Sequence, residues 1–264
     1  MRGLAADWRE LIGEQFEYRE LLRRMIGRDL LLRYKQTIMG FGWAVFMPLM
    51  NTAIFSVIFT RVAPIETPVP YPVFAFCGLW VWNFFSSSLR FSVISLTSNI
   101  NLVTKVYFPR EILPFSSIAV CLVDMAVGAT VLVALMAWYG VPVGIHLLWL
   151  PVVVLATIAF TSAVALMVSM ANLFYRDVKY LFEAFVSAWM FATSVVYPLD
   201  VGGSLGTVLR LNPMTPIIDA YRSVLLLNAP PGAAFWQATA VSVVSLAAAW
   251  LIFHRSEFRF AENI

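Results

Sequence analysis

Long apolar stretches without any charged residue alternate with short charged segments along this chain of 264 residues. A helix rises about 1.5 Å per residue, so about 20 apolar residues are needed to cross the roughly 30 Å hydrocarbon core of a membrane. Charge-free stretches of this length cover residues 36–60 and 67–89, and a longer one runs from 125 to 175. Glycine and proline interrupt the longest stretch at 139–144, so it contributes to two helices.

The pattern predicts an all-α membrane protein with six transmembrane helices. We expect a single transmembrane domain over 1–264, in which 1–35 is a cytoplasmic amphipathic segment, 36–254 is the six-span bundle and 255–264 is a cytoplasmic tail. The expected spans are 36–60, 67–89, 114–138, 147–171, 180–198 and 233–253.

Two further segments do not have the pattern of a simple span. Residues 7–34 place apolar side chains such as Trp8, Leu11, Leu21 and Met25 at helical spacing among charges. This pattern predicts an amphipathic helix, which either lies in the cytoplasmic membrane interface or packs on a partner protein. Residues 199–232 are apolar but interrupted by glycine and proline, which favours short re-entrant helices before the last span.

Composition and charge support the membrane class and give an orientation. Hydrophobic residues make up 61% of the chain and charged residues 12%, and the mean hydropathy is +0.81, values unlike those of a soluble domain. Fourteen of the eighteen lysines and arginines fall on the side of the two termini, which predicts that both termini are cytoplasmic. The net charge of +3 gives no indication of nucleic-acid binding. Cys77 and Cys121 lie in apolar stretches, which is typical of buried thiols.

The sequence lacks the residue patterns that ATP binding, metal binding and histidine-based catalysis require. The three lysines are followed by Gln36, Val106 and Tyr180, so no Gly-Lys-Ser/Thr motif is available to bind ATP. The two histidines, His146 and His254, lie far apart in the sequence, and neither has carboxylate-rich neighbours. We therefore expect no metal site, no cofactor and no histidine-based catalysis in this chain.

Two ionisable residues, Arg90 and Asp124, fall within expected spans. A charge at the centre of a bilayer costs roughly 2.5–3.5 kcal/mol on the insertion scale, so each needs a partner. The structural interpretation is an ion pair between the second and third spans, and the functional alternative is a proton or substrate relay. The ion pair is favoured, because a relay usually needs more than one acid at depth.

Aromatic side chains are concentrated in the second span. Tyr71 fits an aromatic belt at the membrane interface, whereas Trp80, Trp82, Phe84 and Phe85 lie deeper. These deeper rings face lipid, pack in the core or line a path on which sugar rings stack. Trp80 and Phe84, four residues apart, share one helix face, and Trp82 with Phe85 points elsewhere.

Four stretches together resemble the permease subunit of ABC-type exporters of O-antigen, teichoic acid and related polysaccharides. They occur in the order of that family and the resemblance covers nearly the whole chain. They are RDLLLRYKQT (28–37) with GFGWA (40–44) and PL (48–49), NLVTKVYFPREILP (101–114), NLFYRDVK (172–179) with VYPL (196–199), and LNPMTP (211–216).

The resemblance implies a function, partners and a location. The chain would be the transmembrane subunit of an exporter of lipid-linked, O-antigen-like polysaccharide in the inner membrane of a bacterium. It would form a homodimer driven by two copies of a separate ABC ATPase, which binds ATP and Mg²⁺. Residues from about 98 to 113 would contact that ATPase, chiefly through the following six: Lys105, Tyr107, Phe108, Pro109, Arg110 and Glu111. The substrate path would be lined by aromatic side chains, for which the candidates are Trp80, Phe84, Trp82, Phe85 and Tyr71.

Other interpretations remain open from the residues alone. A proton-coupled secondary transporter predicts more acidic residues within the membrane and inverted repeats, neither of which is visible. A membrane-embedded glycosyl or acyl transferase predicts paired carboxylates or a histidine–aspartate pair at one interface, and these are also missing. An ABC exporter permease for teichoic acid or capsule is a further alternative for the substrate.

Overall fold

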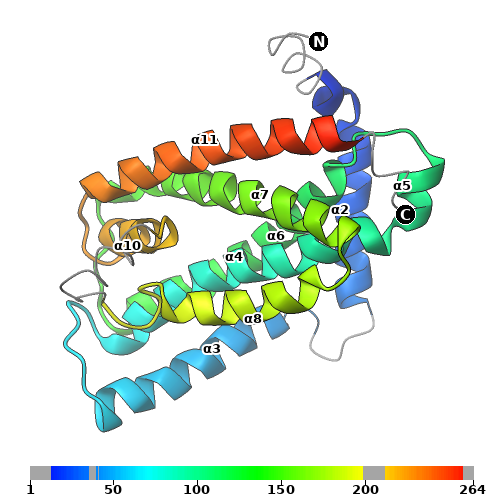
Figure 1. Cartoon of the computed structure of the whole chain (residues 1–264). Helices are drawn as coiled ribbons and strands as arrows, with labels where there is room; N and C mark the ends of the chain where they lie inside the picture. Colours follow the sequence, from blue (N-terminus) through cyan, green and yellow to red (C-terminus); the bar gives the residue numbers. More distant parts are fainter. Residues whose placement is uncertain (1–12, 36–39, 41, 199–211, 258–264) are drawn as a thin grey trace.

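The computed structural model describes residues 13–35, 40, 42–198 and 212–257 as a helical bundle without strands in this part of the chain (Figure 1). This confirms the all-helical architecture. The helices are α2 (Arg19–Tyr34), α3 (Gly42–Val57), α4 (Tyr71–Ser98), α5 (Ile100–Lys105), α6 (Ile112–Trp138), α7 (Leu150–Phe174), α8 (Val178–Phe191), α10 (Met214–Leu225) and α11 (Ala233–Ser256), with a π-turn η1 (Ile58–Val62) and a 3₁₀ turn η2 (Ile145–Trp149).

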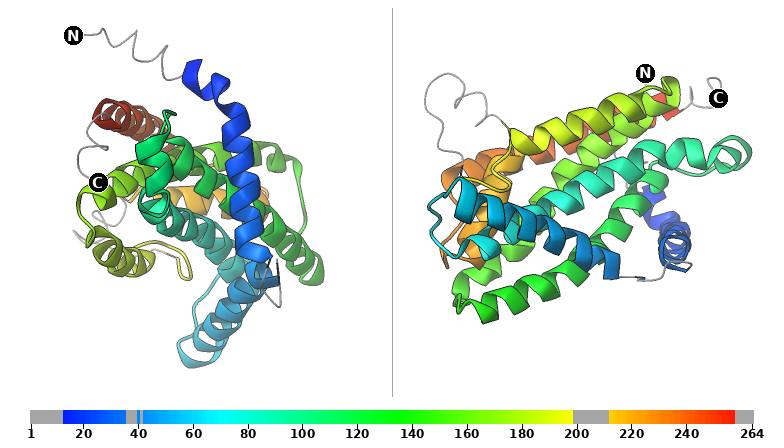
Figure 2. Two further views of the ribbon diagram at one scale, coloured as in Figure 1. Left: turned by 90° about the vertical axis from the view of Figure 1, so that its right-hand side faces the viewer. Right: turned by 90° about the horizontal axis from the view of Figure 1, so that it is seen from below.

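The long helices run between two distinct ends of the molecule. Helices α3, α4, α6, α7, α8 and α11 follow a common direction, and α2 crosses that direction at one end, where α5 and the last turn of α11 also lie (Figures 1 and 2). We call this the α2 end. The opposite end, which holds η1 and the short helix α10, is called the α10 end.

Five helical segments are long and apolar enough to cross a membrane. Among the described residues, five of the six expected spans are thus present. The expected span 180–198 corresponds to α8, which has 14 residues and a length of about 21 Å. Helix α10, with 12 residues, is shorter still, and the described part of the segment expected to be re-entrant contains it. The five segments are Val45–Val62, Tyr71–Ser98, Ile112–Trp138, Ile145–Phe174 and Ala233–Ser256.

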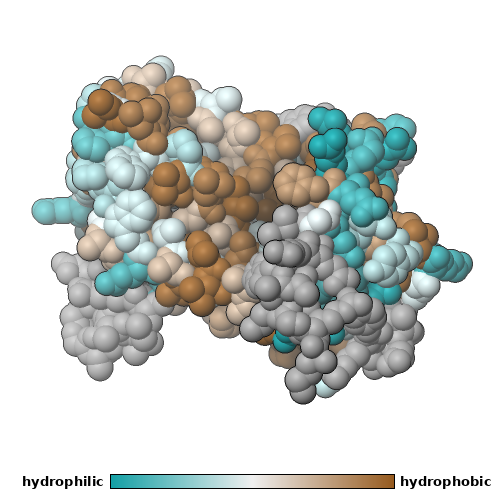
Figure 3. Space-filling model, turned by 90° about the horizontal axis from the view of Figure 1, so that it is seen from above, coloured by the Kyte–Doolittle hydropathy of each residue, from teal (hydrophilic) through white to brown (hydrophobic). Residues whose placement is uncertain are grey.

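Helix α4 forms the centre of the bundle. It packs against α3, α6, α7, α8 and α10, and 83% of its most apolar window is buried. By contrast, α3 has 11% and α11 has 22% of the corresponding window buried, so their apolar side chains lie on the outside of the single chain. The face seen in Figure 3 has a hydrophobic middle with hydrophilic residues towards its two ends, as expected of a surface in contact with lipid.

Local sequence explains where several helices begin and end. Pro72 and Pro151 stand in the first turns of α4 and α7, where the missing backbone N–H of proline has no helical partner to lose. Gly140 follows α6 with a φ of +67°, a left-handed conformation that glycine adopts without strain. It turns the chain towards η2 and α7, so α6 and α7 pack as neighbours.

Candidate functional site

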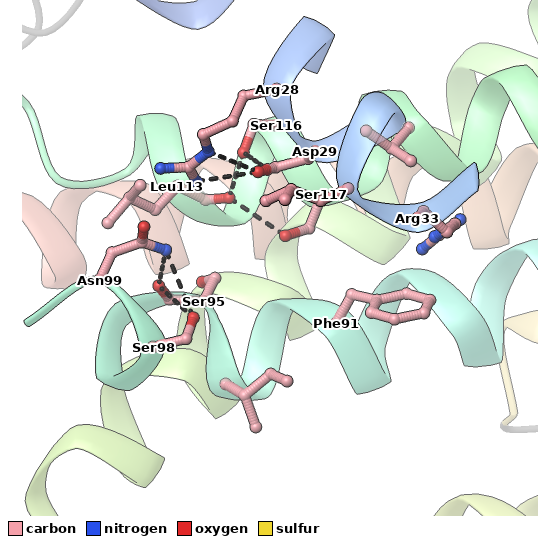
Figure 4. A pocket seen from close by; sticks show the side chains of 13 residues that line it. Arg28, Asp29, Arg33, Phe91, Ser95, Ser98, Asn99, Leu113, Ser116 and Ser117 are labelled. Atoms are coloured by element: carbon pink, nitrogen blue, oxygen red, sulfur yellow. Dashed lines mark hydrogen bonds and ion pairs between the residues drawn. The ribbon is translucent and has the colours of Figure 1, made fainter. Parts of the chain in front are cut away.

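A pocket of about 420 Å³ opens at the α2 end between α2, α4 and α6 (Figure 4). Its wall combines hydroxyl and amide groups with apolar side chains and two guanidinium groups. The lining residues are Arg28, Asp29, Leu32 and Arg33 of α2, Phe91, Ile94, Ser95 and Ser98 of α4, the following Asn99, and Leu113, Ser116, Ser117 and Val120 of α6.

The polar groups of this pocket are held by neighbouring residues. Arg28 donates to the Asp29 carboxylate at 2.8 Å, and Ser116 donates to the same carboxylate at 3.2 Å. Asn99 donates from its amide to the Ser95 carbonyl at 2.8 Å. The charges of Arg28 and Asp29 balance each other, so this part of the pocket is polar and close to neutral, which suits a hydroxyl-rich ligand better than a highly charged one.

Asp124, in α6, is joined to α2 by two side chains. It accepts hydrogen bonds from the Arg33 guanidinium and from the Tyr34 hydroxyl. The Arg33 and Asp124 side chains are only 20% and 16% exposed, and the Arg33 guanidinium also lies 3.8 Å from the centre of the Phe91 ring. Burial and the hydrogen bond to Asp124 raise the pKa of Tyr34 to about 12, so its hydroxyl remains a neutral donor.

The predicted ion pair between Arg90 and Asp124 is wrong. Arg90 instead lies 3.2 Å from the Glu183 carboxylate of α8, and both side chains are substantially exposed. The physical reason is that α2 packs against α6 and supplies a cation to Asp124 from outside the expected spans. The sequence signal was Arg33 at the end of the amphipathic segment, because Asp29, its possible partner four residues earlier, lies next to Arg28 and pairs with it in the structure.

All five aromatic residues predicted to line a substrate path are buried within the single chain. The Trp80 indole donates to the Met125 carbonyl at 2.8 Å, and the Tyr71 hydroxyl donates to the Val196 carbonyl at 2.8 Å. Gly128 lets α6 approach the Trp80 ring, since a Cβ there would lie 2.7 Å from it. Their role in a path is untested by this geometry and remains a prediction.

Trp80 and Phe84 have different neighbours from Trp82 and Phe85, as expected if the two pairs lie on different faces of α4. Trp80 and Phe84 border one small void together with Asn83 and Asp124. Trp82 and Phe85 instead contact the Trp189 ring of α8, with ring centres 6.4 and 5.2 Å apart.

At the α10 end, Arg222 forms a buried connection that the sequence analysis did not identify. Its guanidinium donates to the carbonyls of Ser194 and Val195, each at 2.6 Å, and lies 3.7 Å from the centre of the Phe74 ring. Gly78 of α4 allows this approach, because a Cβ there would lie 2.0 Å from the Val195 oxygen. The available signal was Arg222 in an otherwise apolar helix, with Asp219 one turn earlier as its only charged neighbour in that helix; the two side chains lie 3.3 Å apart in the structure.

Comparison with known proteins assigns the chain to a family. Residues 20–226 match the ABC-2 type transporter family. The chain belongs to that family. It is 32% identical over 258 residues to the O-antigen export system permease protein RfbA of Myxococcus xanthus, with 96% of this chain and 99% of the relative covered. It is also 27% identical over 249 residues to the protein of the same name from Klebsiella pneumoniae, with 92% and 94% covered.

Membership of the ABC-2 family confirms the resemblance seen in the sequence. The chain is an ABC transporter permease, a multi-pass membrane subunit whose family is not catalytic, and such a subunit implies an ABC ATPase as partner. The family match therefore favours the ABC permease over the two alternatives, a proton-coupled transporter and a membrane-embedded transferase. The pairing of Asp124 with Arg33 and Tyr34 also gives this acid a structural role in the permease.

The residues predicted to contact the ATPase divide into exposed and buried groups in the permease. Lys105 and Tyr107 are exposed, the latter by 76%. Phe108 is buried among apolar side chains that include Val103 and Ile112. Pro109 and Glu111 are also buried, and Arg110 is partly buried. Exposed residues therefore carry any direct contact, and the buried ones hold the segment in place.

Proposed function

We propose that this chain is the transmembrane subunit of an ABC exporter that moves lipid-linked, O-antigen-like polysaccharide across the bacterial cytoplasmic membrane. ATP hydrolysis on a separate ATPase subunit would drive the transport. The observation that carries this proposal is the similarity, over almost the full length of both chains, to relatives named O-antigen export system permeases.

The membrane arrangement proposed for this function has six crossings with both termini in the cytoplasm. Helix α8 runs in the common direction of the long helices, and the residues after Phe191 turn at the α10 end to meet Arg222 (Figure 1). The α2 end would face the cytoplasm, since α2 is rich in arginine and Lys105 and Lys179 follow on the same side. The α2 helix then lies in the cytoplasmic interface, and α10 lies near the outer face.

The assembly proposed is two copies of this chain with two ATPase subunits. Helix α3 presents a largely exposed apolar surface, which includes Trp43, Met47, Ile54 and Val57. In a membrane this surface is covered by lipid or by the second copy of the chain. A long polar glycan requires a continuous protein-lined passage, and two half-channels from two copies would form one more readily than a single closely packed bundle.

The pocket at the α2 end is a suitable place for the polar head of the lipid-linked substrate. It lies where the cytoplasmic leaflet would meet α2, and its hydroxyls and amide match the hydroxyl groups of sugars. Closer to the α10 end, Trp80 and Phe84 of α4 are the aromatic side chains proposed to contact sugar rings along the path. Repeated weak ring contacts would let a polymer slide, whereas clustered charges would hold it.

Reconstitution tests this function directly. The permease and its ATPase would be placed together in liposomes that carry a lipid-linked O-polysaccharide, with ATP outside. We expect ATP-dependent appearance of glycan in the lumen, and none with the permease alone or with a hydrolysis-deficient ATPase. ATP-dependent transport of a polyol-phosphate polymer but not of the O-polysaccharide would assign the permease to another substrate class. Lack of transport for both polymers, with active ATPase bound, would contradict the proposal.

A further inference from the structure

Three potential metal ligands from distant parts of the chain meet at the α2 end. Glu14 lies in the helical segment 13–17 that precedes α2, Glu111 stands directly before α6, and His254 lies in the last turn of α11. One ligand atom from each residue lies within 4.8 Å of the other two. Ligands of one divalent cation lie about 2.0–2.6 Å from it and thus at most about 5 Å apart, so this spacing is compatible with one shared ion.

One buried atom of Glu111 and one of His254 have no hydrogen-bond partner among the described residues. Glu111 is fully buried, and although its Oε1 atom accepts a hydrogen bond from the Trp250 indole at 3.2 Å, its Oε2 atom has none within the described structure. The Nδ1 atom of His254 is likewise buried without a hydrogen bond to any described residue. Buried carboxylate oxygens are nearly always hydrogen-bonded or bound to a cation, so these atoms indicate a missing ligand.

Negative charge is concentrated around the same point. A further carboxylate, that of Glu257, lies 3.8 Å from His254 Nδ1 and accepts a hydrogen bond from the Arg110 backbone N–H at 3.0 Å. Three carboxyl groups thus lie close together, and Arg110 already interacts with one of them. A divalent cation would relieve their mutual repulsion.

We propose that Glu14, Glu111 and His254 bind a divalent transition-metal ion. Two carboxylates and one imidazole form a mixed oxygen and nitrogen ligand set, which suits Zn²⁺ or Mn²⁺, whereas Mg²⁺ and Ca²⁺ prefer oxygen ligands alone. The ion joins the segment before α2 to the start of α6 and to the end of α11.

This site revises the expectation that the chain has no metal ligands. His254 has no neighbouring acidic residue in the sequence apart from Glu257 in the following helical turn, so sequence spacing gave no sign of a cluster. The ligands come together only because α6 begins and α11 ends beside the segment that leads into α2. The site does not depend on which substrate is exported.

Metal binding is measured on the full chain in detergent, purified without a histidine tag and treated with a chelator. Zn²⁺, Mn²⁺ and Mg²⁺ are added separately, bound metal is quantified by mass spectrometry after dialysis, and thermal unfolding is followed for each sample. We expect about one Zn²⁺ per chain and a higher unfolding temperature in its presence. Glu14→Gln and His254→Gln should each weaken Zn²⁺ binding by about tenfold or more and remove the thermal shift.

Matched controls separate this site from general metal binding. Glu17→Gln changes an exposed glutamate of the same helical segment, and His146→Gln changes the histidine at the other end of the molecule. Both should bind Zn²⁺ as the unmodified chain does. The proposal is overturned if the unmodified chain binds no Zn²⁺ or Mn²⁺, or if Glu14→Gln and His254→Gln bind as well as the two controls. Equal affinity for Mg²⁺ and Zn²⁺ would overturn the assigned class of ion.

Discussion

The Arg33 guanidinium, in the last turn of α2, contacts the Asp124 carboxylate, which lies within α6. The hydroxyl of Tyr34 donates to the same carboxylate. These contacts join an amphipathic helix to the interior of a membrane-spanning helix. Both charges are largely buried, so removing one of them leaves the other without compensation.

Loss of Arg33 should therefore destabilise the permease. Breaking a buried ion pair from one side costs about 3–5 kcal/mol, and we expect Arg33→Gln to lie near the lower limit because the pair retains some exposure. Replacing both partners, in Arg33→Gln with Asp124→Asn, should cost less than the two single changes added together. Thermal unfolding in detergent measures this difference.

The pair of Arg90 and Glu183 provides the control for that cycle. These side chains are 44% and 62% exposed, and exposed pairs contribute about 0–1 kcal/mol. Arg90→Gln should thus have a small effect. If Arg33→Gln and Arg90→Gln prove equally mild, the contact with Asp124 does not fix α2 on α6.

A second prediction concerns Arg222 at the α10 end. A lysine can carry the charge but cannot make both carbonyl hydrogen bonds and cover the Phe74 ring, so Arg222→Lys should lower stability by about 2 kcal/mol or more. Gly78→Ala should be at least as harmful, because its Cβ would overlap the Val195 oxygen.

Gly27→Ala is the matched glycine control for this prediction. Gly27 lies within α2 and has no atom within 4 Å of a Cβ placed on it. Alanine there should stabilise the helix by about 0.5–1 kcal/mol. Unfolding temperatures that fall by the same amount for Gly27→Ala and Gly78→Ala would show that close packing at Gly78 is not the cause.

The third prediction tests the aromatic path. Because every candidate ring is buried, alanine would cost about 3–5 kcal/mol at each position and would obscure a transport effect. Phe84→Leu keeps a branched apolar side chain but removes the ring, and loss of about 1 kcal/mol of ring contact corresponds to roughly fivefold slower export. Phe85→Leu, which faces Trp189, should affect unfolding temperature and leave the export rate of folded protein unchanged.

Export in the reconstituted system, divided by the amount of folded permease, gives the measurement. A normal rate for Phe84→Leu together with a slow rate for Phe85→Leu would place the path on the opposite face of α4. Normal rates for both would leave these rings with a packing role alone.

The fourth prediction concerns contact with the ATPase. Tyr107 is exposed, whereas Phe108 is buried in the core of the α2 end. We expect Tyr107→Ala to preserve the unfolding temperature and to reduce substrate-stimulated ATP hydrolysis, while Phe108→Ala lowers the unfolding temperature by a large-to-small change in the core.

A cysteine at position 107 provides direct evidence of this contact. The two native cysteines, Cys77 and Cys121, are free and buried, so a crosslinker should react mainly with the introduced thiol. We expect a crosslink between Tyr107→Cys and the ATPase. Crosslinks that form only between two permease chains would assign this segment to the dimer contact instead.

The sequence predicted the helical membrane fold because long charge-free stretches leave few alternatives. It did not predict the pairing of Asp124 with Arg33. The two residues are far apart along the chain and meet only because α2 crosses α6. It also counted 180–198 as a span from composition, whereas the helix ends at Phe191 and the next residues turn to meet Arg222. Periodicity identifies the helices well, but side-chain pairs between distant helices become visible only when the helix packing is known.

The position of Gly78 determines which parts of the α10 end can move separately. Arg222 of α10 holds the carbonyls that follow α8, and these carbonyls rest directly on the Gly78 position of α4. A displacement of α10 relative to the residues that follow α8 must break two buried hydrogen bonds, and a displacement of α10 relative to α4 must withdraw the Arg222 guanidinium from the Phe74 ring. A displacement that carries α10, the end of α8 and the start of α4 together breaks none of these contacts. The contacts at the α10 end therefore favour a shift of these three segments as one block, with the bending in the remaining parts of the long helices.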